Sequence, residues 1–363
     1  MNPEIPALKP PQSANLAATE SKSPATKTLT TSARISFGIM AVLLVLIAWL
    51  HLGTLVLTAM FGYFAMHLFS FGRSKALGVV VYLIAVVAIA TGLYFFSKRV
   101  YKTLPEIADT TIPAVVNFAS RQGIELPFDD YASLKERVQQ EVGERLPNVG
   151  TYARATALQL AMLLIGVVVA ISLFIDAKWE VEDDPDVVKN SLYATVVREL
   201  ILRFTTFFRS FARVIGAQIL ISVINTTATA VFLVWNGFHY ITVIIVLTFL
   251  CGLLPIIGNL ISNTLIIGVA FTVSPNSPKL AVIALVFLVV IHKLEYFLNS
   301  KIIGDRIKNP MWLTLIGLVL GEKLMGIPGI ILAPVVLHYI KVEASRNKAA
   351  DEGADALRAG STK

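Results

Sequence analysis

The chain has 363 residues, of which 55% are hydrophobic and only 15% are charged, and its mean hydropathy is +0.71. Soluble domains usually carry about 25% charged residues, so this composition excludes an ordinary soluble protein. The formal net charge is +7, but the Lys and Arg residues lie between hydrophobic segments and form no single stripe, which argues against nucleic-acid binding. The one cysteine, Cys251, can form no disulfide within the chain.

The first part of the chain predicts a polar tail followed by three membrane spans. Residues 1–34 are rich in Pro, Ser, Thr, Ala and Lys, so we expect a disordered cytoplasmic tail. The apolar stretch from Ile35 to Phe71 is too long for one upright helix, and His51-Leu52-Gly53 predicts a turn between two short spans. The uncharged stretch from Ala76 to Phe96 predicts the third span.

A long polar insertion follows the third span. Residues 97–154 are expected outside the cytoplasm, and Pro105, Pro113 and Pro127 are expected to divide the first part into short helices. Apolar residues every four positions from Leu134 to Leu146, among charged ones, predict an amphipathic helix.

A second polar segment separates the next two spans. Ala155 to Ile175 is uncharged and predicts a span, and residues 176–213 are acidic first and basic later. The basic part carries a row of apolar side chains, which predicts a separate amphipathic helix at the cytoplasmic membrane surface.

The span predicted from Val214 to Val234 carries a polar stripe. Its members recur at helical spacing on one narrow face, so they should meet other helices or water and not lipid. Two interpretations stay open, which are hydrogen bonding between helices and the lining of a transport pathway. The stripe consists of Gln218, Ser222, Asn225 and Thr229.

Two later apolar segments are interrupted by Pro and Gly. The runs on either side of Pro255 and of Gly326 are short for a bilayer crossing, which takes about 20 helical residues. Paired, interrupted hydrophobic segments are typical of transporter binding sites, because broken helices free backbone polar groups. The alternative for each break is a simple turn. Around the first break the candidate pathway residues are Pro255, Gly258, Asn259 and Asn263.

The distribution of positive charge supports two-legged elements at both breaks. If the tail is cytoplasmic, each interrupted segment must enter and leave the membrane on the sides that place the later Lys and Arg residues in the cytoplasm. Positive-inside bias prefers this arrangement, and it requires two legs at each break. The sequence therefore predicts an all-α, polytopic helical membrane protein of about eight passes, two of them broken or hairpin elements. We expect one transporter domain over residues 35–345, and a disordered cytoplasmic tail over residues 346–363.

Four motifs occur in the order seen in AI-2E family transporters, which the chain resembles from about Ile35 to Lys341. The resemblance implies a multi-pass bacterial inner-membrane protein with both termini in the cytoplasm. Members of the family are linked to export or uptake of autoinducer-2, and some to sodium or lithium exchange against protons. This chain departs from the family pattern at Ile256, Asn259 and Ser300. The motifs are Gly216-Ala217-Gln218, Leu254-Pro255-Ile256-Ile257-Gly258, Glu295 to Gly304, and Gly321 to Pro334.

A second group of residues is a candidate for coupling or gating. An acid within the membrane is costly and tends to be functional, so Glu295 is a candidate for a proton or cation role, and anchoring at the interface is the alternative. Glu322 is expected either at a hydrated tip or at a glycine-flanked gate. The whole group consists of Glu295, Asn299, Gly304, Glu322, Gly326 and Gly329.

The sequence favours a secondary or passive transporter of a small polar solute. A sodium or lithium/proton antiporter and a non-transporting scaffold are the alternatives. No nucleophile motif, phosphate loop or metal-ligand spacing is present, so we expect no enzyme, no cofactor and no metal. The expected partners are the lipid bilayer and a small polar solute or monovalent cation, and a homo-oligomer is compatible with the sequence.

Overall fold

A computed structural model describes residues 31–70, 74–124, 130, 132–133, 136, 149–176, 192–255, 257–273, 279–303 and 310–360. Within these ranges the secondary structure is α-helical and no strand occurs. Apart from Glu136, the helix predicted from Leu134 to Leu146 lies outside the described residues, and so do the segment 177–191 and Gly304. The predicted all-helical fold class is confirmed.

Five helical segments are long and apolar enough to cross a membrane. At most 44% of the residues in the apolar window of each segment are buried inside the protein, which leaves surface for contact with lipid. Three further apolar helical segments are shorter, at Gly53–Phe69, Ile241–Gly252 and Gly258–Val273. The five long segments are Thr31–Trp49, Lys75–Arg121, Arg154–Asp176, Leu192–Trp235 and Ile327–Ser345.

The turn predicted at His51 separates the first two helices. α1 spans Thr31–Trp49 and α2 spans Gly53–Phe69, and His51 between them has a positive φ of 53°. α2 packs against α5, which spans Val149–Asp176. Small residues allow this close packing, because a Cβ added at Gly62 would lie 2.7 Å from the Cβ of Ala170.

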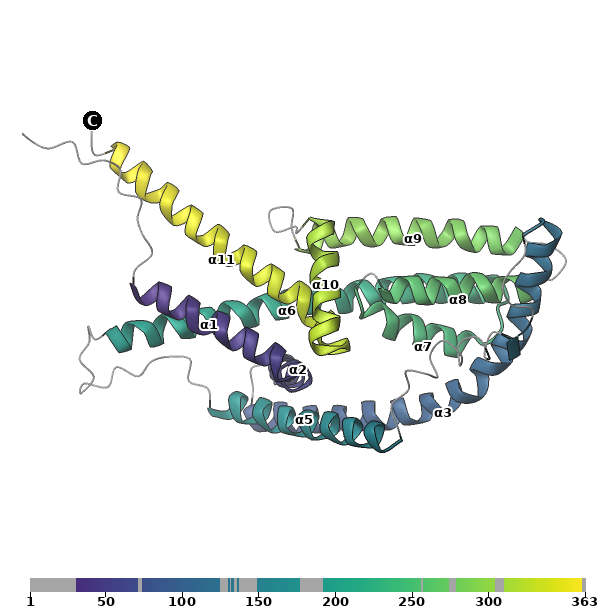
Figure 1. Cartoon of the computed structure of the whole chain (residues 1–363), viewed down its shortest axis with the longest axis horizontal. Coiled ribbons are helices and arrows are strands. Elements are labelled where there is room, and N and C mark those ends of the chain that lie inside the picture. The colour runs from purple at the N-terminus through teal and green to yellow at the C-terminus, as the bar shows by residue number, and fades with distance from the viewer. Residues whose placement is uncertain are drawn as a thin grey trace, which may run out of the picture.

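α3 is one helix from Lys75 to Arg121, and the prediction that Pro105 and Pro113 divide it was wrong. Both prolines lie inside the helix, which curves instead of ending (Figure 1). A proline in a helix removes one hydrogen bond and bends the axis, and here tertiary packing of the later half holds the bent helix together. That later half packs against α8, and the rings of Phe118 and Phe271 are 5.1 Å apart.

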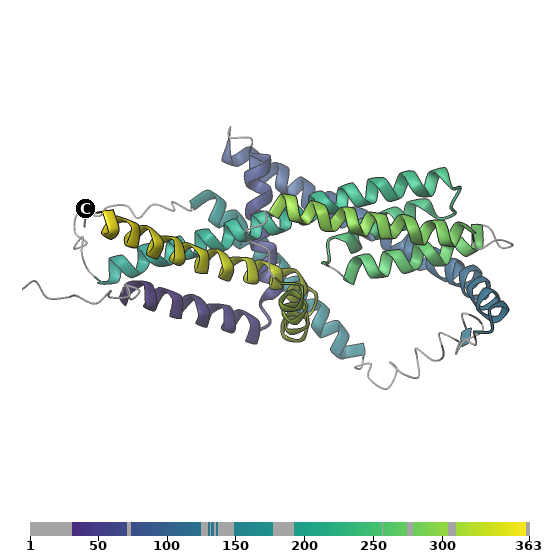
Figure 2. The same ribbon diagram turned by 90° about the horizontal axis from the view of Figure 1, so that it is seen from above.

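α6 is likewise one helix, from Leu192 to Trp235, so the predicted boundary at Val214 does not occur. No proline interrupts it, and two of the apolar side chains expected at a membrane surface are instead buried in the protein interior. Phe207 and Phe211 are buried in a core cluster with Val335 and Tyr339. α6 therefore joins two parts of the molecule, beside α1 and α11 at one end and beside α7 and α9 at the other (Figures 1 and 2).

Both predicted helix breaks are present. α7 spans Ile241–Gly252 and α8 spans Ile257–Val273, with Pro255 between them, and α9 follows at Lys279–Ile303. α10 spans Met311–Met325 and α11 begins at Ile327, so Gly326 separates them. α11 contains Pro334 and continues to Gly360, past the position where a tail was expected.

Candidate functional site

The polar stripe of α6 faces the broken end of α7. Gln218 donates a hydrogen bond through Nε2 to the carbonyl of Gly252, at 2.6 Å, and Ser222 donates through Oγ to the carbonyl of Phe249, at 2.8 Å. The last carbonyls of a helix have no partner within it. Because α7 ends before Pro255, its terminal carbonyls need hydrogen-bond donors from elsewhere, and α6 side chains supply two of them. For these two stripe residues, bonding between helices is confirmed, and these two carbonyls are occupied by the protein itself.

The close approach of α6, α7 and α8 depends on two glycines. A Cβ added at Gly252 would lie 2.6 Å from the Oγ of Ser222, and one added at Gly258 would overlap the main-chain carbonyl of Cys251. The α7–α8 pair is therefore folded tightly back on itself at the break. This geometry brings Asn259, in the first turn of α8, to the level of the α6 stripe and α9.

Glu295 of α9 is the centre of the candidate site. Its side chain is buried, at 8% exposure, and Asn259 donates a hydrogen bond through Nδ2 to its Oε2. The side chain of Asn225, from the α6 stripe, interacts with the same carboxylate. Residues from α6, α8 and α9 thus meet at one carboxylate. The alternative from the sequence was anchoring at the membrane interface, with Lys293 or Lys301 as the partner. Lys293 is exposed, and the side chain of Lys301 lies outside the described residues.

Beside Glu295, not every buried polar atom has a hydrogen-bond partner in the described structure. His292 Nδ1 lies 3.8 Å from Glu295 Oε2, and its ring is mostly exposed. Asn225 is 6% exposed, and its Oδ1 atom has no hydrogen-bond partner in the described structure. Elsewhere, on α7, the hydroxyl of Thr248 is also buried and has no hydrogen-bond partner among the described residues. Buried acceptors without partners are costly unless a ligand, an ion or water completes them.

The other predicted pathway residues lie near this site at different depths. Thr229 is buried, and Pro255 and Asn263 are half-buried. Asn299 lies in α9, but its side chain and all of Gly304 are outside what the structure describes. Among the described residues, no group of three His, Cys, Asp or Glu side chains could hold a metal ion.

The second break forms a separate structure. Gly321 of α10 and Gly329 of α11 are packed so closely that a Cβ at either would overlap the backbone of the other. Gly326 between them has φ 66° and ψ −142°, and the Glu322 side chain is exposed. The tip packs against the start of α2, since a Cβ at Gly53 would lie 3.0 Å from Met325 and Pro328. The two breaks are therefore two sites, and Glu295 belongs to the first.

Sequence reasoning missed a buried charge cluster that joins α1, α6 and α11. Arg203 on α6 bonds Glu343 on α11 and Glu199 one turn earlier on α6, at 2.8 and 2.9 Å. Its Nε donates to the Oγ of Ser36 on α1, at 3.3 Å. The signal in the sequence was weak, because Glu343 is an acid among the bases near Lys341. Charge patterning indicated a surface helix at Arg203, whereas its guanidinium is only 2% exposed.

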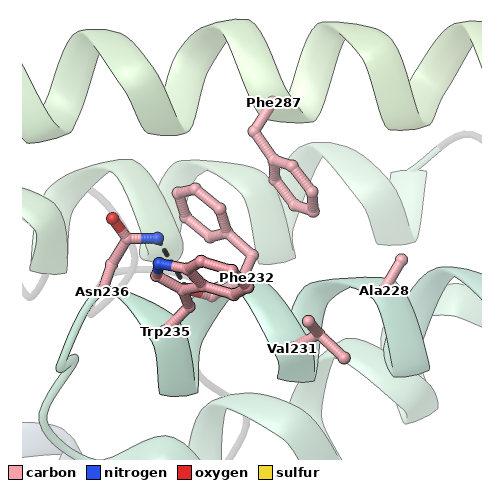
Figure 3. A pocket seen from close by; sticks show the side chains of 6 residues that line it. All are labelled: Ala228, Val231, Phe232, Trp235, Asn236 and Phe287. Carbon is pink, nitrogen blue, oxygen red and sulfur yellow. Dashed lines mark hydrogen bonds between the residues drawn. The ribbon is translucent and has the colours of Figure 1, made fainter.

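A shallow apolar groove lies between α6 and α9, away from Glu295. It has a volume of about 310 Å³, and the rings of Phe232 and Phe287 stack across it at 4.2 Å (Figure 3). Its polar group, the Asn236 amide, already donates to the carbonyl of Phe232, at 2.8 Å. Such a lining suits hydrocarbon and not a polar cargo. The lining residues are Ala228, Val231, Phe232, Trp235, Asn236 and Phe287.

The helical fold and its long apolar segments define a multi-pass membrane protein. The profile of the AI-2E family transporter matches residues 35–345, and the chain belongs to that family of membrane transporters.

Similarity to individual proteins is more limited. The chain is 26% identical over 162 residues to the Bacillus subtilis (strain 168) protein named "Putative transport protein YdbI". The aligned region covers 44% of this chain and 46% of that relative, so it spans about half of each. No solved structure matches the chain.

Proposed function

We propose that this protein is a secondary or passive transporter of a small polar solute, with its binding and coupling site at Glu295, Asn259 and Asn225. The site lies where the α7–α8 break meets the polar stripe of α6. We further propose that it works in a bacterial inner membrane with both termini in the cytoplasm, without a cofactor and without enzymatic activity.

The observation that carries the proposal is the burial of the Glu295 carboxylate among side chains from three helices. A carboxylate at the centre of a bilayer costs about 2.5 to 3.5 kcal/mol on insertion scales, and such residues mark substrate or ion pathways. Two asparagines beside it supply neutral donors and acceptors, which can be exchanged for those of a polar solute. The buried Oδ1 of Asn225 is an acceptor that such a solute could satisfy.

The resemblance to AI-2E transporters makes autoinducer-2 the first solute to test. It is a small polar molecule, and the site offers a carboxylate and two amides to hydroxyl groups. The apolar groove between α6 and α9 lacks such groups, which supports the choice of the Glu295 site over the groove.

A sodium or lithium/proton antiporter is the second candidate, and the same carboxylate favours it. Carboxylate and amide oxygens are ligands that suit hard cations, and Glu295 with the Asn225 Oδ1 presents both. A carboxylate can also carry a proton in alternation with the cation. Antiport therefore requires that Glu295 be ionisable, whereas solute transport requires only its hydrogen bonds.

The experiment measures flux in proteoliposomes of the purified full chain, with and without a pH gradient. The probes are autoinducer-2 and sodium-22. Autoinducer-2 flux that ignores the pH gradient supports a passive carrier, and sodium flux that follows the gradient supports the antiporter. If neither probe moves faster than in empty liposomes, the result contradicts transport of these two solutes and favours the non-transporting scaffold.

A matched pair of variants locates the site. Glu295→Gln keeps the size and polarity of the side chain and removes its charge, and we expect it to abolish gradient-driven sodium flux. Glu106→Gln makes the same change at an exposed position on α3 and should leave flux unchanged. Gradient-driven sodium flux that is equal in wild type and Glu295→Gln would exclude the proposed role of Glu295 in antiport.

A further inference from the structure

A basic and aromatic patch lies on the exposed side of α3, directly after its uncharged stretch. The aromatic members are strongly exposed, up to 83% for Tyr101, and the three basic members are exposed as well. We call this surface the α3 patch. It consists of Tyr94, Phe95, Lys98, Arg99, Tyr101 and Lys102.

The position of the patch along α3 matches a membrane boundary. The uncharged stretch from Ala76 to Phe96 is about 31 Å long at about 1.5 Å per residue, close to the thickness of a bilayer hydrocarbon core. Lys98 and Arg99 therefore follow at the depth of the lipid phosphates. At the opposite border Lys75 donates through Nζ to the carbonyl of Ile175, at 2.7 Å, so that base already has a protein partner.

The patch is one continuous stripe on the helix. Tyr94, Lys98 and Lys102 follow one another at four-residue steps, and Phe95 and Arg99 form the neighbouring row. The Lys98 ammonium lies 4.8 Å from the centre of the Tyr94 ring. None of the ion pairs found among the described residues involves a base of the patch. Three cations are thus presented outward beside aromatic rings.

We propose that the α3 patch binds the phosphate headgroups of anionic phospholipids. Aromatic rings prefer the interfacial zone of a bilayer, and clustered Lys and Arg residues are attracted to anionic lipid surfaces. A zwitterionic headgroup has no net charge, so it attracts three positive side chains less strongly than an anionic headgroup does. An acidic protein would not explain why the bases follow the aromatic rings at this depth.

The patch adjoins the part of α3 that packs on the α7–α8 element. Ile107 follows the patch by little more than one helical turn, and it is buried in a cluster with Ile266 and Ala270 of α8. Phe118 contacts Phe271, further along both helices. A lipid held at the patch therefore fixes the start of the segment that covers α8, whose first turn carries Asn259. The consequence for transport rests on the proposed function, and lipid binding itself does not.

Lipid binding is tested by native mass spectrometry of the purified full chain. The probes are phosphatidylglycerol and phosphatidylcholine. Wild type should retain phosphatidylglycerol preferentially, and K98Q/R99Q/K102Q should lose roughly tenfold or more of that preference. The control R121Q/R154Q/R209Q removes three exposed bases elsewhere and should keep the preference. An unchanged preference in K98Q/R99Q/K102Q overturns the proposal.

Two further measurements keep the test decisive if the triple variant folds poorly. The preference of wild type should decline as salt is raised, because exposed charges are screened. K98R/K102R, which keeps the charges, should retain the preference, and K98Q/K102Q should weaken it. A preference that changes neither with salt nor in K98Q/K102Q contradicts an electrostatic headgroup site.

The effect of lipid binding on transport is measured separately, as flux in proteoliposomes with and without phosphatidylglycerol. We expect wild-type flux of autoinducer-2 or sodium-22 to rise with phosphatidylglycerol, and K98Q/R99Q/K102Q to lose this response. Flux that ignores phosphatidylglycerol, although the lipid binds selectively, overturns the regulatory part alone. Absence of flux in every lipid, with selective binding intact, counts against the proposed function and leaves the lipid site standing.

Discussion

Arg203 and Glu343 form a buried ion pair with 2.8 Å between Nη1 and Oε2, although they are 140 positions apart in the sequence. The guanidinium also lies 3.5 Å from the centre of the Phe37 ring on α1. Arg203 therefore holds α11 and α1 against the first half of α6, whereas the Glu295 site contacts the second half of the same helix. Removing one partner of a buried pair leaves the other charge uncompensated.

We predict that Arg203→Met lowers the free energy of unfolding by about 3 to 5 kcal/mol. The physical reason is that Glu343 would stay buried without its cation. Thermal unfolding of the purified protein in detergent, followed by tryptophan fluorescence, measures the loss. R203M/E343M should recover part of it, and the exposed Arg209→Met should have little effect. Equal stability of wild type and Arg203→Met would contradict a structural role for the pair.

The tight fold at the first break predicts that Gly258→Ala is destabilising. The new methyl group would overlap the carbonyl of Cys251, so α7 and α8 must separate. Overpacking of this kind costs about 1 to 3 kcal/mol and should also lower flux, because Asn259 follows directly. Gly216→Ala is the matched control, since it lies in α6 with no atom within 4 Å of the new methyl group. It should be neutral or stabilise slightly.

Asn225→Leu separates the pathway from packing. Its Oδ1 has no partner in the described structure, so Asn225→Leu removes one buried unsatisfied acceptor, but it also removes a polar partner of the buried Glu295 carboxylate. The two effects oppose each other, so the melting temperature should fall only modestly. The flux that the wild-type protein carries should fall at least tenfold. Thr227→Val, at an exposed position on the same helix, should change neither quantity. Retained flux with Asn225→Leu would make this residue a packing residue.

Ser222→Ala should show the reverse pattern. The Phe249 carbonyl would lose its donor, at a cost of about 1 to 3 kcal/mol in unfolding free energy, while the Glu295 site keeps its own groups. Melting temperature and flux are measured on the same preparation. A variant with normal stability and no flux would place Ser222 in the pathway.

The break at Gly326 predicts a backbone effect at the second site. Its φ of 66° with ψ of −142° is a conformation that residues with a side chain rarely adopt. Gly326→Ala should therefore destabilise the α10–α11 element by about 1 to 3 kcal/mol, although the new methyl group meets no neighbouring atom. Gly92→Ala, with equally open surroundings inside α3, is the control for thermal unfolding. Equal melting temperatures for the two variants would contradict backbone strain.

The elements that sequence predicted well are those set by local chemistry. The turn at His51 and the breaks at Pro255 and Gly326 follow from residues that end helices, and the structure confirms all three. The continuity of α3 through Pro105 was not predictable, because packing of its later half on α8 overrides a local preference. The same reasoning explains α6, whose basic first half is held by α1 and α11.

The candidate site was predictable in its members but not in its geometry. Helical spacing placed Asn225 and Ser222 on one face, yet it could not tell that Ser222 bonds a free carbonyl while Asn225 reaches Glu295. Glu295 was ambiguous because burial depends on neighbours from other helices. The partner of Arg203 was hidden for the same reason, since 140 positions separate the two charges.

A single uninterrupted helix carries both Arg203 and Asn225, about 33 Å apart at about 1.5 Å per residue. Rotation of this rod about its middle would displace its two ends in opposite directions. Any tilt of α6 that moves Asn225 relative to Glu295 must therefore also move Arg203 relative to Glu343, so the two clusters are mechanically coupled through this helix.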